Sequence, residues 1–123
     1  TACPCIRYAN GYYYVIYLEH RTPTWRFESY ITRSNDLKHW ELSAANPVLT
    51  AELPGDGINA SDVDLVECGG KTWMYYCVAD QLTWADIVRT AYDGPLDQFL
   101  AAWFAAPGIP DVGAVAVKIR QKD

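Results

Sequence analysis

Apolar side chains cluster in short segments that are separated by turn-forming residues. Residues 3–8 and 12–18 flank Asn10 and Gly11, the pair that most strongly predicts a two-residue β-hairpin turn, because both residues accept positive φ. Residues 12–18 are apolar or aromatic at every position, so this strand is predicted to be covered on both faces.

Two more strands are predicted before residue 50. Residues 25–33 alternate between apolar and polar side chains, which is typical of a strand with one buried face. Turn-forming side chains at 34–36 follow, and residues 40–42 are predicted to form a short outer strand. Together with the hairpin, these segments predict a four-stranded antiparallel meander at about residues 2–50.

The same succession recurs in the second half of the chain. Aligning Asn10 with Gly69 gives an offset of 59 residues (69 − 10). At this offset Cys3 falls on Asp62 and Cys5 on Asp64. The apolar and aromatic matches are Ile6 with Leu65, Tyr14 with Trp73, Ile16 with Tyr75, Tyr17 with Tyr76, Leu37 with Leu96 and Trp40 with Phe99.

Repeated four-stranded units of this length predict the blades of a β-propeller. We therefore expect an all-β fold: two four-stranded antiparallel propeller blades plus a C-terminal extra strand. Residues 1–123 would form a single partial propeller domain, with blade 1 at about 2–50 and blade 2 at about 59–104. Residues 105–123 would be an appended tail, with its strand at 112–119.

Composition narrows the classes of partner. Half of the 123 residues are hydrophobic, so we expect one folded domain with a single core. The net charge of −5 and the absence of a basic run argue against a nucleic-acid partner. No apolar stretch approaches the roughly 20 residues that cross a bilayer, so no membrane partner is expected.

The cysteines indicate a reduced protein. The four cysteines include no pair of C-x-x-C motifs, which argues against a structural zinc ribbon. No feature of the sequence indicates secretion, so buried free thiols and a cytoplasmic location are expected rather than disulfides and export.

The strongest candidate site is the stretch 59–65. Because side chains alternate along a strand, Asp62 and Asp64 are predicted to share one face while Val63 and Leu65 point into the core. Two like charges on one face need a cation, a donor network or a substrate to compensate them. A solvated strand end that carries two acids is the simpler alternative. In a propeller, the first strand of each blade lines the channel, so both acids would face the axis.

A divalent metal, zinc or similar, is the cofactor that would hold converging carboxylates together. The predicted ligands are Asp62, Asp64, His20 and His39, with Asp62, Asp64 and Glu19 as catalytic residues. A metal lowers the pKa of bound water to about 7 and so supplies hydroxide for ester or phosphoester hydrolysis. Solvated histidines are the alternative for His20 and His39. No dinucleotide or phosphate-loop motif occurs, so no organic cofactor is expected.

Three further side chains are candidates for binding a small-molecule substrate. Arg7 could bind an anionic group, although a salt bridge is the alternative role. Tyr8 and Trp25 provide aromatic surface on which a sugar or an aryl group could stack.

The order of several motifs resembles five-bladed β-propeller glycosidases of the family 43-like and family 117-like kind. The resemblance covers about residues 2–104 and is carried by residues 3–8 with the hairpin at 10–14, by Arg-Ser-Asn-Asp-Leu-Lys-His-Trp at 33–40, by Asn-Pro-Val-Leu at 46–49 and by 59–64. It implies that Asp62 is one of the acidic residues on the innermost strands that share acid, base and pKa-tuning roles. Such propellers need five blades, so the chain resembles a fragment.

Two blades alone would leave apolar faces and strand edges open to water. We therefore predict a homo-oligomer, a dimer or tetramer, whose copies bring Asp62 and Asp64 together. The predicted function is metal-dependent ester or phosphoester hydrolysis at that interface. One alternative is a glycoside hydrolase, whose two carboxylates lie about 5–5.5 or 6.5–9.5 Å apart across the sugar. The other is a non-catalytic carbohydrate-binding or structural propeller fragment.

Overall fold

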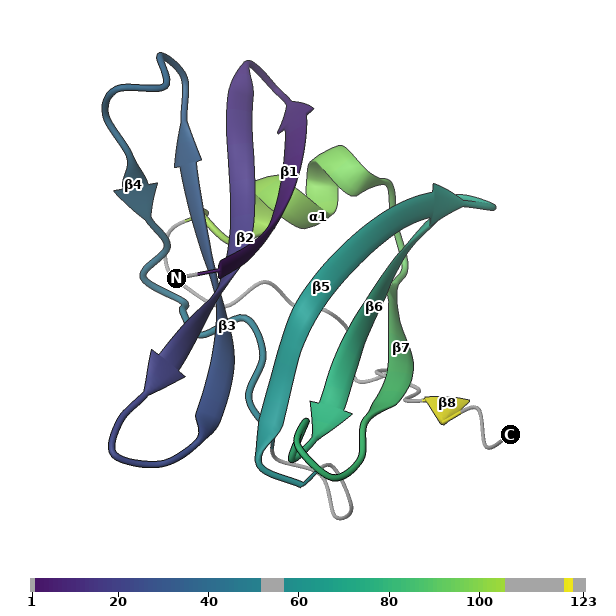
Figure 1. Ribbon diagram of the computed structural model, residues 1–123. Coiled ribbons are helices and arrows are strands. Elements are labelled where there is room, and N and C mark those ends of the chain that lie inside the picture. Colours follow the sequence, from purple (N-terminus) through teal and green to yellow (C-terminus); the bar gives the residue numbers. More distant parts are fainter. Residues whose placement is uncertain (1, 52–56, 106–118, 121–123) are drawn as a thin grey trace.

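The computed structural model describes residues 2–51, 57–105 and 119–120, which form two antiparallel sheets with one short helix beside them (Figure 1). We call the sheet β1-β2-β3-β4 blade 1 and the sheet β5-β6-β7-β8 blade 2. The strands are β1 (Ala2–Ala9), β2 (Tyr12–Arg21), β3 (Arg26–Ser34), β4 (Glu41–Leu42), β5 (Asn59–Cys68), β6 (Lys71–Ala79), β7 (Asp86–Tyr92) and β8 (Ile119–Arg120), and the helix is α1 (Leu96–Ala102). The prediction of an all-β fold with two four-stranded antiparallel sheets is confirmed.

The first hairpin of each blade turns at the residues that the sequence indicates. Asn10 and Gly11 have φ of 53° and 79°, and Gly69 and Gly70 have φ of 62° and 72°. Left-handed backbone at both central positions is what a tight hairpin turn requires. The two turns therefore fix the register of both hairpins, 59 residues apart.

Each innermost strand also carries an irregularity at the same place in the repeat. The register shifts between Ala2 and Cys5 in β1 and between Ser61 and Asp64 in β5. Cys3 and Asp62 have φ of 49° and 58°, so each is an extra residue in left-handed conformation within a bulge. This shared bulge is structural evidence for the internal repeat.

The hydrophobic core lies between the two sheets. From blade 1 it takes Tyr14, Ile16 and Ile31, and from blade 2 it takes Leu65, Met74, Tyr76 and Val88. On β2 only the core-facing side chains Tyr14, Ile16 and Leu18 are buried, whereas Tyr13, Val15 and Tyr17 on the other side are half-buried. Within one chain only one face of this strand is fully covered, because no third layer lies over blade 1 in the described part of the chain. That another layer covers the second face stays a prediction.

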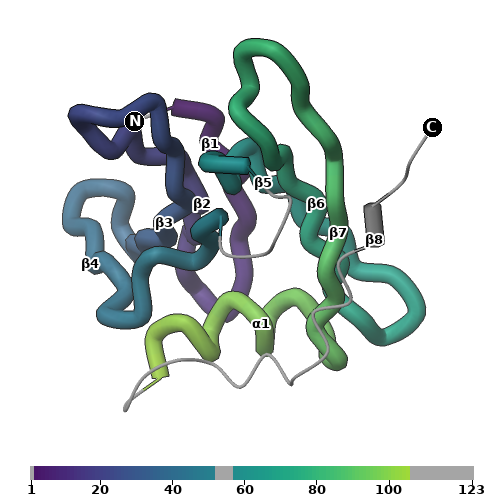
Figure 2. The backbone as a smooth tube through the Cα atoms, turned by 90° about the horizontal axis from the view of Figure 1, so that it is seen from below, coloured from purple at the N-terminus to yellow at the C-terminus, as the bar shows by residue number. Residues whose placement is uncertain are grey.

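The segment after β7 departs from the repeat. Leu96 and Phe99, aligned by the sequence with Leu37 and Trp40 of the turn before β4, begin the seven-residue helix α1. Phe99 and Leu100 are buried. They lie three and four residues after Leu96, and apolar side chains at this spacing share one helix face. Figure 2 shows α1 running beside both sheets.

Blade 2 receives its fourth strand from the segment predicted to be an appended tail. The two-residue strand β8 pairs with β7 through Arg120 opposite Val88 and Ile119 opposite Arg89. The rest of the strand expected at 112–119 lies outside the described residues. Within the described ranges, no helix is long and apolar enough to cross a bilayer.

The thiols are only partly as expected. All four cysteines are free. Cys5 is buried, whereas Cys3 and Cys68 are exposed and Cys77 is half-buried, so the expectation of burial holds for Cys5 alone. Cys3 is exposed because the bulge in β1 turns it away from the core.

Candidate functional site

The inner strands β1 and β5 lie side by side where the two blades meet (Figure 1). On β5, Asp62 and Asp64 are exposed, while Val63 and Leu65 are 7% and 4% exposed and belong to the core. Both carboxylates therefore stand on the open side of the strand that lies nearest the other blade.

Asp62 is held by a hydrogen-bond chain from the turn between β6 and β7. The fully buried Ser61 donates its hydroxyl to Asp62 Oδ2 at 2.6 Å. Gln81 Nε2 donates to Ser61 Oγ at 2.9 Å, and Gln81 has left-handed backbone, with φ of 57°. These two hydrogen bonds restrain the orientation of the Asp62 carboxylate.

Cys3 of blade 1 meets Asp62 of blade 2. A hydrogen bond to the Asp62 carboxylate raises the pKa of the Cys3 thiol, and burial and the negative charge of Asp62 add to the effect. Burial, followed by the charges of Asp62 and Asp86, raises the pKa of Cys77. The two residues in equivalent bulges are therefore neighbours, and the thiols around Asp62 are kept protonated.

Asp64 has a different environment, because it forms a salt bridge with the guanidinium of Arg7. Arg7 Nη2 donates to Asp64 Oδ1 at 2.6 Å and to the carbonyl of Leu65 at 2.7 Å. The side chain of Arg7 is 31% exposed and that of Asp64 is 76% exposed. Arg7, a candidate for substrate binding, is thus engaged in a salt bridge between the blades, which is the alternative role considered for it.

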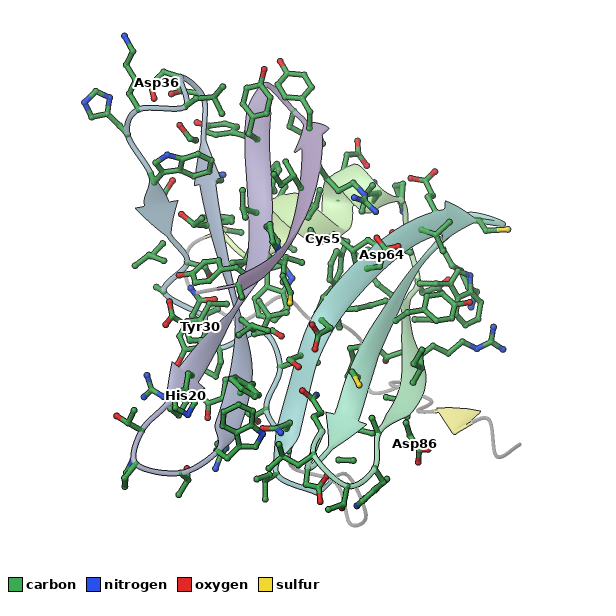
Figure 3. All side chains as sticks on the ribbon, in the orientation of Figure 1. Cys5, His20, Tyr30, Asp36, Asp64 and Asp86 are labelled. Carbon is green, nitrogen blue, oxygen red and sulfur yellow. The ribbon has the colours of Figure 1, made fainter. Side chains whose placement is uncertain are left out.

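The two histidines lie at opposite ends of blade 1. The ring of His20 is 5.6 Å from that of Trp25 and 5.4 Å from that of Phe27. His39 Nδ1 is 2.7 Å from Asp36 Oδ2, and this hydrogen bond, with the charge of Asp36, raises the pKa of His39. Figure 3 shows His20 near the turn between β2 and β3, and Asp36 at the far end of the same sheet.

The predicted metal ligands are consequently not gathered within one chain. Among the residues that the structure describes, no three His, Cys, Asp or Glu side chains are arranged to hold a metal ion. Any metal centre that uses Asp62 and Asp64 would need ligands from elsewhere.

The remaining candidates lie on blade 1. Glu19 of β2 lies directly opposite Glu28 of β3 in the strand register. Tyr8 is 65% exposed and lies toward the first hairpin turn, with its ring 4.8 Å from that of Tyr13. Trp25 is 45% exposed in the turn just before β3, at the opposite end of the blade from Tyr8.

Three polar residues organise this region: Asn59, Ser61 and Gln81. Sequence reasoning included Asn59 and Ser61 in the candidate stretch 59–65 without giving them a role, and it missed Gln81. Asn59 is fully buried. Its Oδ1 accepts from the backbone N–H of Phe27 at 2.7 Å, and its Nδ2 donates to the carbonyl of Asp80 at 3.0 Å. The available signal was the run of polar and small residues at 59–61, at the start of a strand whose later positions alternate between charged and apolar residues.

Comparison of the sequence with protein families finds no match, and comparison with curated proteins finds none either. Among solved structures, the fold is similar to a β-xylosidase, with TM-score 0.60 and 22% identity over 76% of this chain and 32% of that protein. It is also similar to an exo-1,5-α-L-arabinanase from a bovine ruminal metagenomic library, with TM-score 0.50 and 15% identity over 96% of this chain and 34% of that protein. The chain spans about a third of the length of each.

These similarities concern the fold, and they agree with the resemblance indicated by the motifs. Both neighbours are named as glycosidases, and the part of each that matches is a minority of its length. The chain therefore has the fold of a two-bladed portion of a propeller glycosidase.

Proposed function

We propose that the chain is part of a glycoside hydrolase and that Asp62 is one of the carboxylates that act on the glycosidic bond. The observation that carries the proposal is the bulge in β5, which turns Asp62 out of the ladder toward the neighbouring inner strand while Ser61 and Gln81 fix its orientation. A carboxylate oriented in advance can serve charge stabilisation or proton transfer at little cost in reorganisation.

This function fits the molecule better than the metal-dependent ester hydrolase expected from the sequence. The four expected ligands do not form a cluster of three or more in the described residues, and Arg7 already neutralises Asp64. The two structural neighbours are named for hydrolysis of xylose- and arabinose-based glycosides, so pentose oligosaccharides are the substrate class that we propose.

Asp62 needs a second carboxyl group on the other side of the sugar, about 5–5.5 Å away for a retaining enzyme or 6.5–9.5 Å for an inverting one. Asp64 does not supply it, because it is on the same strand and is bound to Arg7. We propose that another blade supplies the second acid, from a second copy of the chain. The exposed apolar side chains on the outer faces of both blades favour such packing: Ile6, Tyr8 and Leu42 on blade 1, and Val66, Tyr75 and Ile87 on blade 2.

The test is hydrolysis of 4-nitrophenyl β-xyloside and 4-nitrophenyl α-arabinofuranoside in the presence of EDTA. We expect turnover that survives the chelator and falls roughly 10²–10⁴-fold in Asp62→Asn, the range for losing an acid–base group. Asp93→Asn is the matched control, because Asp93 is an exposed carboxylate paired with Lys71 at 3.5 Å and should not affect activity.

Two results would contradict the proposal. One is activity in Asp62→Asn equal to that of the unmodified chain. The other is activity toward nitrophenyl esters or phosphates that requires added zinc, with no activity toward the glycosides. Light scattering on the same samples measures the copy number, and a monomer at every active concentration would remove the second-copy part of the proposal.

A further inference from the structure

Two exposed tryptophans lie in corresponding turns of the two blades, each between the second and third strands. Trp25 and Trp84 are separated by the repeat offset of 59 residues (84 − 25), and each directly follows a threonine. Trp25 is 45% exposed and Trp84 is 44% exposed. We propose that they form a paired stacking surface for successive rings of an oligosaccharide that reaches Asp62. This inference rests on the proposed glycoside hydrolase function.

Both tryptophans lie at the end of the blades where Asp62 is found. Trp25 lies in the turn between β2 and β3, and Trp84 in the turn between β6 and β7. Figure 1 shows these two turns at the same, lower end of the sheets. The bulge of β5 that contains Asp62 pairs with the last part of β6, beside Cys77, and so lies toward the same turns.

A buried side chain ties the two turns together. Asn59 accepts from the N–H of Phe27, two residues after Trp25, at 2.7 Å. Its amide donates to the carbonyl of Asp80, which opens the turn that contains Trp84, at 3.0 Å. A buried amide that satisfies both turns fixes their relative position, because breaking either bond would leave a buried polar group unpaired.

The turn that carries Trp84 is ordered from within and is linked to Asp62. The Asp80 carboxylate accepts from the backbone N–H of Trp84 at 3.1 Å. The hydrogen bond from the Thr83 hydroxyl, followed by those from the backbone N–H groups of the turn, lowers the pKa of Asp80. The carbonyl of Trp84 accepts from the N–H of Gln81 at 3.0 Å. Gln81 in turn holds Ser61, the donor to Asp62. The position of Trp84 is thus coupled to the candidate catalytic carboxylate.

Trp25 is braced by aromatic neighbours on blade 1. Its ring meets Phe27 nearly at right angles, with centroids 4.9 Å apart, and meets His20 edge-on at 5.6 Å. Such edge contacts restrain an aromatic ring without covering it completely. They also give His20 a role in positioning Trp25.

Trp40 and its repeat-equivalent residue differ in exposure, whereas Trp25 and Trp84 do not. Trp40 is 44% exposed, but the residue at its repeat-equivalent position, Phe99, is 2% exposed in the core. In the corresponding turns, at positions 25 and 84, the indole is by comparison exposed in both blades. A flat apolar surface repeated at one rim, beside an oriented carboxylate, suits the apolar C–H face of a sugar ring and leaves its hydroxyls to water.

The test is calorimetric titration of the 123-residue chain with xylotetraose and with arabinotetraose, in an Asp62→Asn background so that no sugar is consumed. We expect Trp84→Ala and Trp25→Ala each to weaken binding roughly tenfold, the effect of losing about 1.4 kcal/mol of apolar contact. Trp84→Phe should keep most of the affinity, because it keeps a flat ring. Trp40→Ala, an equally exposed indole at the other end of blade 1, is the matched control and should bind as the background does.

The inference is overturned if the Asp62→Asn chain binds neither sugar, or if Trp84→Ala and Trp40→Ala weaken binding equally. It is also overturned if Trp84→Ala leaves binding intact and lowers the mass in solution, since Trp84 would then contact another copy. Thermal melting of each variant checks that it is folded. Sugar binding that persists while the aryl-glycoside assay shows no turnover would refute the proposed function and leave the stacking surface in place.

Discussion

The first hairpins of the two blades have the same strand register, but the blades bury opposite faces. On β2 of blade 1, Tyr14 is fully buried and Tyr17 is half-buried. At the equivalent positions on β6 of blade 2, Trp73 is half-buried and Tyr76 is 1% exposed. In a stack of blades, the front of one packs on the back of the next, so a repeated sequence must be apolar on both faces. Each blade buries the face that packs on the other blade and leaves its opposite face half-buried, with Tyr17 on that face of blade 1 and Trp73 on that face of blade 2.

The blades also differ in the chemistry of one shared backbone feature. The bulges at Cys3 and Asp62 have nearly the same φ, 49° and 58°, but one carries a thiol and the other a carboxylate. The repeat therefore provides geometry, while the residue at the bulge determines what that position can do. Because Cys3 and Asp62 are in contact, the thiol of one bulge and the carboxylate of the other lie beside each other.

The largest expected effect comes from truncating equivalent tyrosines on the two faces. Tyr76→Ala should lower the free energy of unfolding by about 3–5 kcal/mol, because it empties a core position. Tyr17→Ala should cost about 1 kcal/mol, as for a half-exposed side chain. Urea unfolding followed by circular dichroism measures both.

Equal costs in a sample that remains monomeric would contradict the assignment of buried and open faces. Equal costs in a sample of higher mass would mean that a second copy covers Tyr17, and Tyr17→Ala should then also reduce the mass measured by light scattering.

Local patterns in the sequence were sufficient for the hairpins, the repeat and the exposure of Asp62 and Asp64, but they did not predict the left-handed bulge at Asp62. The turn residues Asn10 and Gly69 fix register locally, and alternation fixes which way a strand side chain points. The helix α1 was not predicted, because the offset that aligns Leu96 with Leu37 takes no account of the spacing of three and four residues from Leu96 to Phe99 and Leu100, which is typical of a helix. A repeat offset compares sequence positions and carries no information on local conformation.

The network around Asp62 depends on contacts that a linear pattern does not specify. Gln81 reaches Ser61 across 20 residues, and Asn59 reaches Phe27 across 32. The expectation that His20 and His39 complete one site with these carboxylates did not take account of the strand directions. The histidines lie toward opposite ends of β3, because His20 is near the end of β2, His39 follows β3, and the two strands run antiparallel.

A smaller effect tests the meeting of the two bulges. Asp62→Asn should lower the pKa of Cys3, because it removes the carboxylate whose hydrogen bond and charge favour the protonated thiol. More of Cys3 is then thiolate at pH 8, and alkylation by iodoacetamide should be faster. Tandem mass spectrometry of tryptic peptide 1–7, with fragment ions that separate Cys3 from Cys5, measures the rate, with the exposed thiol of Cys68 as the internal reference.

Asp64→Asn is the paired control, because the thiol that lies near Asp64 is that of Cys5 and not that of Cys3. An unchanged alkylation rate of Cys3 in Asp62→Asn would contradict the contact between the bulges and, with it, the position of Asp62 beside β1.

The smallest effect distinguishes the two carboxylates of β5. A double-mutant cycle with Arg7→Ala and Asp64→Asn should give a coupling energy of about 0.2–1 kcal/mol, the usual range for a partly exposed ion pair, and the coupling should decrease in 1 M salt. The same cycle with Arg7→Ala and Asp62→Asn should give no coupling, because the described partners of Asp62 are the neutral Ser61 and Cys3. Equal coupling in both cycles would mean that Arg7 serves both acids, and the distinction between a structural Asp64 and a reactive Asp62 would then be lost.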